Sequence, residues 1–119
     1  MGALHRLERL VVALEQRVGY VGDLTTTGRR SGRPNSVTVG FVRDRDGTIL
    51  IAAQRPSSAW AANLGKDPRC EFTVRRSARR FVARELSGTE REAAIRRIRR
   101  RYGGDPRYGP GTAFRLWPN

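Results

Sequence analysis

In this chain of 119 residues, the stretch LTTTGRRSGRP at residues 24–34 is the most informative one for predicting the fold. The run Thr25–Thr27 favours an extended strand. The strand stops at residues 28–34, where two glycines, three arginines and a proline indicate a loop. Glycine lets backbone N–H groups approach an anion, and arginine supplies forked donors that match phosphate or carboxylate. The stretch therefore predicts either an exposed basic hairpin or an anion-binding turn, and its spacing is not that of a Walker loop.

Strand patterns continue beyond this turn. Residues 36–43 alternate in hydrophobicity, with Val37, Val39 and Phe41 expected on one face, and a hairpin turn follows at residues 44–47. The other expected strands cover residues 23–27, 48–53, 69–76, 79–86 and 112–117, and the expected helices cover residues 3–18, 57–65 and 89–102, the last opened by a capping box at residues 89–92. Because the first strands have no helices between them, a parallel βαβ sheet is disfavoured. The sequence predicts one mainly β (α+β) domain over residues 1–119, an antiparallel barrel or strongly curled sheet with helices outside it.

The charge is strongly positive. The chain carries 24 basic and 11 acidic residues, a formal net charge of +13, and Lys66 is its only lysine. Such a field attracts polyanions: nucleic acid, acidic lipid or a phosphorylated small molecule. Because no nucleic-acid-binding motif is present, a nucleic acid is the least favoured of these partners.

Histidine and cysteine are nearly absent. His5 and Cys70 are single occurrences, which excludes an internal disulfide and a multi-cysteine zinc site and argues against histidine-based catalysis or a metal site. Cys70 takes an inward position in its strand pattern and is expected in the core. A chain this poor in acid–base groups either uses a bound cofactor for its chemistry or only binds a ligand.

The N-terminal segment, within residues 1–18, is expected to be an amphipathic helix. Its apolar stripe consists of Leu4, Leu7, Val11, Leu14 and Val18. It packs on the domain or, as a basic amphipathic helix, contacts a membrane or a partner chain. With no apolar run of about 20 residues and no secretory signal, we expect a cytoplasmic protein, with a peripheral position at the inner face of the membrane as the alternative.

Two further segments suggest a ligand pocket. Trp60 and Leu64 are four residues apart in the expected helix 57–65, so both can face the core, and Asn63 lies beside them. A tryptophan beside an amide suits a flat ring system with a polar edge, or else is simply a core residue. Tyr102 and Tyr108 flank a Gly/Pro-rich loop and could line the mouth of a pocket.

Taken together, these motifs resemble the deazaflavin-dependent nitroreductase family, split β-barrel reductases that use coenzyme F-420. The family signature appears here as residues 24–34, then Trp60, Asn63, Leu64 and Pro68, and the resemblance covers about residues 4–118. It implies a split β-barrel, related to the FMN-binding oxidases, that transfers hydride from reduced F-420 to a quinone, enone or nitroaromatic compound. It also implies a homodimer with the site near the interface.

The resemblance assigns roles to particular residues. The loop holds the phosphate and acidic tail of the coenzyme, the strand that follows it runs along the deazaflavin ring, two residues wall the ring, and two tyrosines lie near the substrate, one phenol donating a proton or hydrogen bond. The loop residues are Thr27, Gly28, Arg29, Arg30, Ser31, Gly32, Arg33 and Asn35; the strand residues are Val37, Thr38 and Val39; the wall residues are Trp60 and Asn63; the tyrosines are Tyr102 and Tyr108.

Three positions depart from the family pattern. Asn35 stands where many relatives have arginine, Thr38 replaces a common proline, and the loop over residues 54–59 is shorter than usual. These departures keep FMN open as the cofactor. They also keep open a non-catalytic split-barrel protein that binds FMN, haem or a lipid-like ligand, and, from the charge, a basic nucleic-acid-binding protein.

Overall fold

The computed structural model describes residues 20–53, 58–103 and 111–119. The expected helix at residues 3–18, its contact with a membrane, and Tyr108 lie outside these residues and remain predictions. None of the helices in the described ranges combines the length and apolar character needed to cross a membrane.

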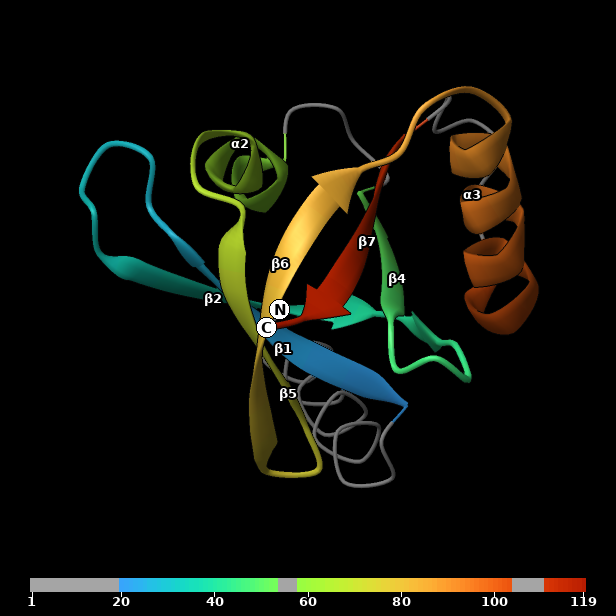
Figure 1. Cartoon of the computed structure of the whole chain (residues 1–119), viewed down its shortest axis with the longest axis horizontal. Coiled ribbons are helices and arrows are strands. Elements are labelled where there is room, and N and C mark those ends of the chain that lie inside the picture. Colours follow the sequence, from blue (N-terminus) through green and yellow to red (C-terminus); the bar gives the residue numbers. More distant parts are fainter. Residues whose placement is uncertain (1–19, 54–57, 104–110) are drawn as a thin grey trace, which may run out of the picture.

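The described residues form a curled antiparallel sheet with two helices against it (Figure 1). Its strands are β1 (Val21–Thr27), β2 (Pro34–Gly40), β3 (Val42–Arg43), β4 (Ile49–Ala53), β5 (Arg69–Val74), β6 (Ser77–Glu85) and β7 (Thr112–Pro118), and the helices are α2 (Ala59–Lys66) and α3 (Gly88–Tyr102). The strand order is β2-β1-β5-β6-β7-β4-β3, and every pair is antiparallel. This is the predicted split-barrel class.

Strand β4 shows how the two layers of core arise. Ile49 and Ile51 point into the barrel, where they join the main cluster with Phe72 and Phe114. Leu50, between them, points outward into a second cluster with residues of α3. Because successive side chains of a strand face opposite sides, a strand covered on both faces needs a continuous apolar run, which ILIAA supplies.

The prediction of one strand over residues 36–43 is wrong. The chain bends at Phe41, so that β2 pairs with β1 whereas β3 pairs with β4, at opposite ends of the strand order. Tyr102 enforces the bend, because its ring packs on Gly40 so closely that a Cβ there would lie 2.9 Å from it. Phe41 enters the core as expected, but Val37 does not: it remains 36% exposed on the edge strand β2.

The capping box predicted at residues 89–92 is also wrong. Helix α3 begins one residue earlier, with Ser87 in the N-cap position and no side-chain capping bond. Gly88 adopts φ +58°, which turns the chain from β6 into the helix. The Glu90 carboxylate forms an ion pair with Arg84 on β6 and does not cap the N-terminus of the helix.

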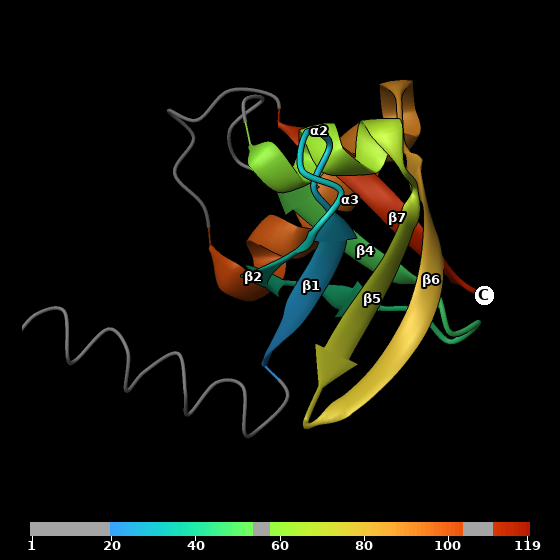
Figure 2. The same cartoon turned by 90° about the vertical axis from the view of Figure 1, so that its left-hand side faces the viewer.

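The two ends of the barrel differ in what they carry. The hairpin loop between β1 and β2 and helix α2 lie at one end, and the β5–β6 turn lies at the other (Figure 2). Strand β1, between β2 and β5, runs from one end to the other.

Candidate active site

The loop over residues 28–33 is a compact hydrogen-bonded turn. The Gly28 N–H donates to the carbonyl of Arg33 at 2.8 Å, and the Gly32 N–H donates to the carbonyl of Gly28 at 2.9 Å. The Ser31 hydroxyl accepts from the Arg33 N–H at 3.1 Å. Gly32 has φ +70°, and a Cβ on Gly28 would lie 2.6 Å from the Ser31 hydroxyl oxygen. The backbone conformation therefore favours glycine at residue 32, and the lack of space for a Cβ favours glycine at residue 28.

Asn63 holds this loop in place from helix α2. The side chain is 2% exposed. Its Oδ1 accepts from the backbone N–H and from Nη1 of Arg29, each at 3.1 Å. Its Nδ2 donates to the hydroxyl of buried Thr26 at 3.0 Å. Lys66 adds a fourth link, because its ammonium donates to the carbonyl of Arg29 at 2.8 Å.

A cavity of about 590 Å³ opens between this loop, β2 and the start of α2. Its polar side consists of the loop and the β2 hydroxyl and amide groups, and its apolar side consists of Val37, Ala59 and Trp60. The full lining is Thr26, Gly28, Arg29, Arg30, Ser31, Asn35, Ser36, Val37, Ser58, Ala59, Trp60 and Asn63. Trp60 is half-buried and packs on Phe114 with ring centroids 5.8 Å apart, so the indole is held rigidly against the core.

The structure brings together most, but not all, of the predicted cofactor residues. Those that line this cavity are Gly28, Arg29, Arg30, Ser31, Asn35, Val37, Trp60 and Asn63. Arg33, Thr38 and Val39 do not line it: the Thr38 hydroxyl donates to Asp23 at 3.0 Å, and Val39 packs on the core. Four further residues line the cavity that were not among the predicted cofactor residues: Thr26, Ser36, Ser58 and Ala59. Thr26 and Ser36 belong to the hydroxyl-bearing stretch around the basic turn, which was the available signal for them.

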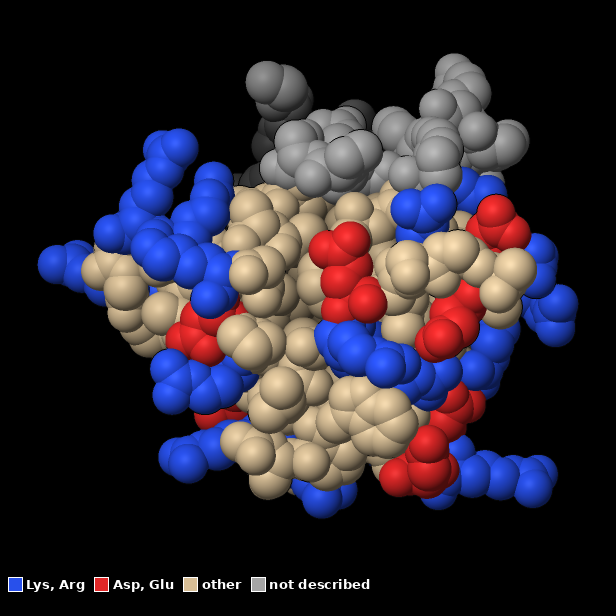
Figure 3. Space-filling model, turned by 45° about the horizontal axis from the view of Figure 1, so that its top comes forward, with Lys and Arg blue, Asp and Glu red and all other residues tan. Residues whose placement is uncertain are grey.

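The outer side of the same loop borders a second hollow, of about 560 Å³. Thr27 and Gly32 line it, together with Lys66, Asp67 and Arg69. Asp67 pairs with Arg69 at 3.0 Å, and the hydrogen bond from Arg69 lowers the pKa of its carboxyl. Lys and Arg side chains gather at the left of the molecule, around this loop (Figure 3). The basic turn thus has open space on both sides.

Tyr102 lies away from the cavity lining. Its hydroxyl accepts from the Phe41 N–H at 2.9 Å, and its single proton is shared between the main-chain carbonyls of Tyr20 and Phe41. The phenol therefore clamps the bend between β2 and β3. Cys70 is a core residue as predicted, and burial raises the pKa of its thiol to about 12, which removes it as a nucleophile.

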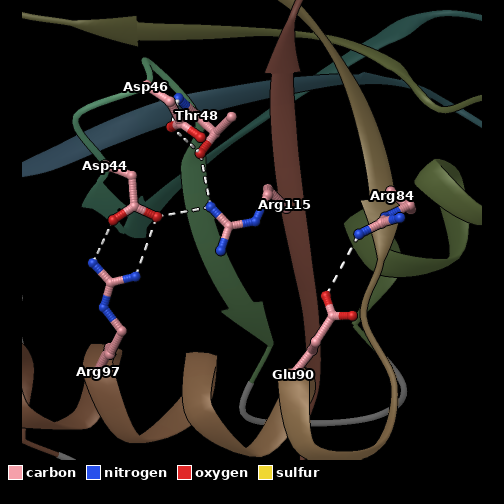
Figure 4. A network of polar contacts seen from close by, with 7 residues as sticks. All are labelled: Asp44, Asp46, Thr48, Arg84, Glu90, Arg97 and Arg115. Atoms are coloured by element: carbon pink, nitrogen blue, oxygen red, sulfur yellow. Dashed lines mark hydrogen bonds and ion pairs between the residues drawn. The ribbon is translucent and has the colours of Figure 1, made fainter.

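Three arginines on or near α3, Arg84, Arg97 and Arg115, are tied to carboxylates (Figure 4). The Arg97 guanidinium donates two hydrogen bonds, of 2.6 and 3.1 Å, to the Asp44 carboxylate, and Arg115 donates a third of 2.7 Å. The hydrogen bonds from Arg97 and Arg115 lower the pKa of Asp44 to about 2. This network joins α3 to the β3–β4 turn and to β7, so these charges serve the fold.

The fold and cavity define a class: a split β-barrel in which an arginine-rich hairpin loop and a flat apolar wall share one cavity. The family model described as F-420H2-dependent quinone reductase matches residues 9–115, and the chain belongs to this family. It is therefore an oxidoreductase whose cofactor is coenzyme F-420. Guanidinium donors at one side of the cavity and an indole at the other suit a coenzyme with a phosphate and a flat ring.

Solved structures agree on the fold. An F-420-dependent reductase called FDR-A is 22% identical with a TM-score of 0.69, over 82% of this chain and 93% of that one. A domain-swapped dimer is 22% identical with a TM-score of 0.71, over 98% and 99% of the two chains. The haem storage protein HutZ from Vibrio cholerae is 18% identical with a TM-score of 0.66, over 92% and 88%.

Proposed function

We propose that this protein reduces a quinone, with the cavity beside the residue 28–33 loop as the coenzyme site. When bound, reduced F-420 supplies the hydride. The single observation that carries the proposal is that one cavity combines the Arg29 and Arg30 guanidinium groups with the Trp60 and Val37 wall. The matching family's description supports a quinone as the acceptor.

The chain's own residues bind, orient and exclude water. Arg30 and Ser31, both exposed at the cavity, donate hydrogen bonds to the phosphate of the coenzyme. Arg29 contributes positive charge from a side chain already oriented by Asn63. Trp60 and Val37 cover the flat ring and displace water from it. Asn63 is a positioning residue, because both ends of its amide are used within the protein.

The two tyrosines receive different roles. Tyr108 keeps the predicted role of proton or hydrogen-bond donor to the acceptor. The Tyr102 hydroxyl is engaged by three main-chain groups, so we assign Tyr102 to positioning the β2–β3 bend rather than to contact with substrate. Tyr108→Phe should then lower kcat with little change in stability, whereas Tyr102→Phe should chiefly lower stability.

A homodimer is part of the proposal. Among the described strands, β2 pairs only with β1, and residues Pro34–Thr38 are exposed along it. An open edge strand with an exposed Val37 suits contact with a second copy at the cavity. Sedimentation of the purified protein tests this, and a monomer at all concentrations would contradict it.

Tryptophan fluorescence gives a direct test of coenzyme binding. Trp60 lines the cavity, whereas Trp117 is 43% exposed on β7, so Trp117→Phe leaves Trp60 as the sole reporter. F-420 should quench Trp60, and the affinity should fall as salt rises, because guanidinium–phosphate contacts are screened. Quenching by FMN and not by F-420 would refute the coenzyme assignment.

A matched pair of charge variants locates the phosphate. Arg30→Ala should weaken F-420 binding about tenfold, since it removes one charge-assisted contact. Arg45→Ala removes the same charge from the exposed β3–β4 turn and should change binding little. Equal losses in both variants would show that only net charge matters and would refute the site.

A further inference from the structure

Another basic hollow lies at the opposite end of β1 from the coenzyme loop, next to the β5–β6 turn; this turn is at the bottom of Figure 2. Its volume is about 580 Å³. The floor is apolar and the rim is basic: the floor consists of Phe41, Ile49, Phe72, Val74 and Phe81, and the rim includes Arg43, Arg75, Arg79 and Arg101. No Asp or Glu is present among the described residues that line it.

Two of the rim arginines are held in place by aromatic rings. The guanidinium carbons of Arg43 and Arg101 lie 5.9 and 5.3 Å from the centroid of the Phe41 ring. Arg101 also lies 5.3 Å from the ring of Tyr102. The two guanidinium groups thus lie at most about 11 Å apart, both beside the Phe41 ring at the edge of the hollow.

This arrangement differs from that of the other arginine clusters. Arg97 and Arg115 share Asp44, and Arg69 pairs with Asp67. Those pairs serve the fold. The hollow near the β5–β6 turn instead has no Asp or Glu among the described residues of its lining, and Arg43 and Arg101 at its rim lie beside an aromatic ring.

The backbone of the β5–β6 turn holds two arginines in a conformation that favours glycine. Arg75 and Arg76 have φ values of +51° and +66°, in the left-handed region. Two-residue hairpin turns of this kind favour Asn-Gly, and each side chain other than glycine costs about 1–2 kcal/mol there. Arginine at such positions lowers stability, and strained residues of this kind cluster at ligand sites. One of the two, Arg75, lines the hollow.

We propose that this end of the barrel binds an organic anion: a phosphate or carboxylate carried on a small apolar group. The guanidinium groups supply forked donors for the anion, and the floor of Phe and Val side chains contacts the apolar group. The site is separate from the coenzyme cavity, because the two share no lining residue and lie at opposite ends of β1. The ligand therefore binds together with the coenzyme rather than in its place.

Phenyl phosphate and inorganic phosphate are suitable probes, followed by amide chemical shifts in the full-length ¹⁵N-labelled protein. Phenyl phosphate should shift the amides of residues 41–43 and 74–79. Inorganic phosphate should bind there several-fold more weakly, because it cannot contact the floor. Equal affinity of the two probes would overturn the apolar part of the proposal.

Two double variants with equal charge loss provide the decisive comparison. Arg43→Gln with Arg79→Gln should raise the Kd of phenyl phosphate at residues 41–43 and 74–79 about tenfold. Arg30→Gln with Arg33→Gln, in the coenzyme loop, should leave that Kd unchanged while reducing any shift at residues 28–33. Equal weakening by both pairs, or shifts confined to the loop, would overturn the site.

Vesicles distinguish the sources of the anion. If phosphatidylglycerol vesicles displace phenyl phosphate and phosphatidylcholine vesicles do not, the bound group is a lipid headgroup. If neither displaces it, a free small molecule is the ligand. Vesicle binding by a protein that does not bind phenyl phosphate at all would refute the cavity and leave only a basic surface.

Discussion

Asn63→Ala tests whether one buried amide organises the coenzyme loop. The substitution removes three hydrogen bonds, two to Arg29 and one to Thr26. Each is worth about 0.5–1.5 kcal/mol, and the hydroxyl of Thr26, itself 2% exposed, loses a partner. We expect the free energy of unfolding to fall by about 3 kcal/mol, which lowers Tm by roughly 10 °C in a domain of this size.

The same substitution should weaken F-420 binding. Arg29 loses the contact that orients its guanidinium, and the loop loses its anchor to α2. We expect a loss of affinity of about tenfold, from the cost of ordering the loop on binding. Urea unfolding and fluorescence titration of the same preparation measure both effects.

Thr26→Val completes a double-mutant cycle, because valine preserves the shape of threonine and removes only the hydroxyl. If the Asn63–Thr26 bond is real, the two substitutions should be coupled by about 1 kcal/mol. A coupling near zero, or a loss of less than about 0.5 kcal/mol in Asn63→Ala, would refute the positioning role.

Three other perturbations follow from the same structure. Because the pKa of Asp44 is lowered from 3.8 to about 2, its contribution to stability is complete above pH 3.8 and lost as the pH falls through 2. Asp44→Asn should lower the free energy of unfolding by about 1 kcal/mol at pH 6, after allowance for solvent screening. In urea unfolding from pH 6 to pH 2, this variant should lose less stability than the unsubstituted protein does. Gly28→Ala should weaken F-420 binding at least tenfold in titrations, because its Cβ would lie 2.6 Å from a loop hydroxyl, whereas Gly32→Ala, at φ +70° in open space, should cost about 1 kcal/mol of stability and little affinity. Replacing Arg75-Arg76 by Asn-Gly should raise the free energy of unfolding by about 1–2 kcal/mol, and a destabilised variant would contradict the left-handed turn.

Local patterns in the sequence were enough to predict much of the fold. The threonine run, the glycine and arginine turn and the spacing of Trp60 and Leu64 predicted the β1–β2 hairpin and the packing of α2. These features depend on neighbours a few residues away, so the sequence shows them directly. The bend at Phe41 was not visible, because alternation indicates an extended chain without showing which strand it pairs with.

Contacts between distant residues explain the other misses. Tyr102 bonds to Phe41, 61 residues away, and Arg97 bonds to Asp44, 53 residues away. Nothing in either local pattern indicates such a partner. Asn63 was predicted at the cavity and lies there, but that its amide holds Thr26 and Arg29 became apparent only from the structure.

The exposure of strand β2 affects how readily substitutions can change the binding cavity of this protein. Residues Pro34–Thr38 are all exposed, so they add almost nothing to the core, yet three of them border the cavity that we propose for the coenzyme. Substitutions there escape the usual stability penalty for altering a binding pocket. A library randomised at residues 35–37 should retain mostly folded members, and selection on it can explore new acceptors at little risk to the scaffold.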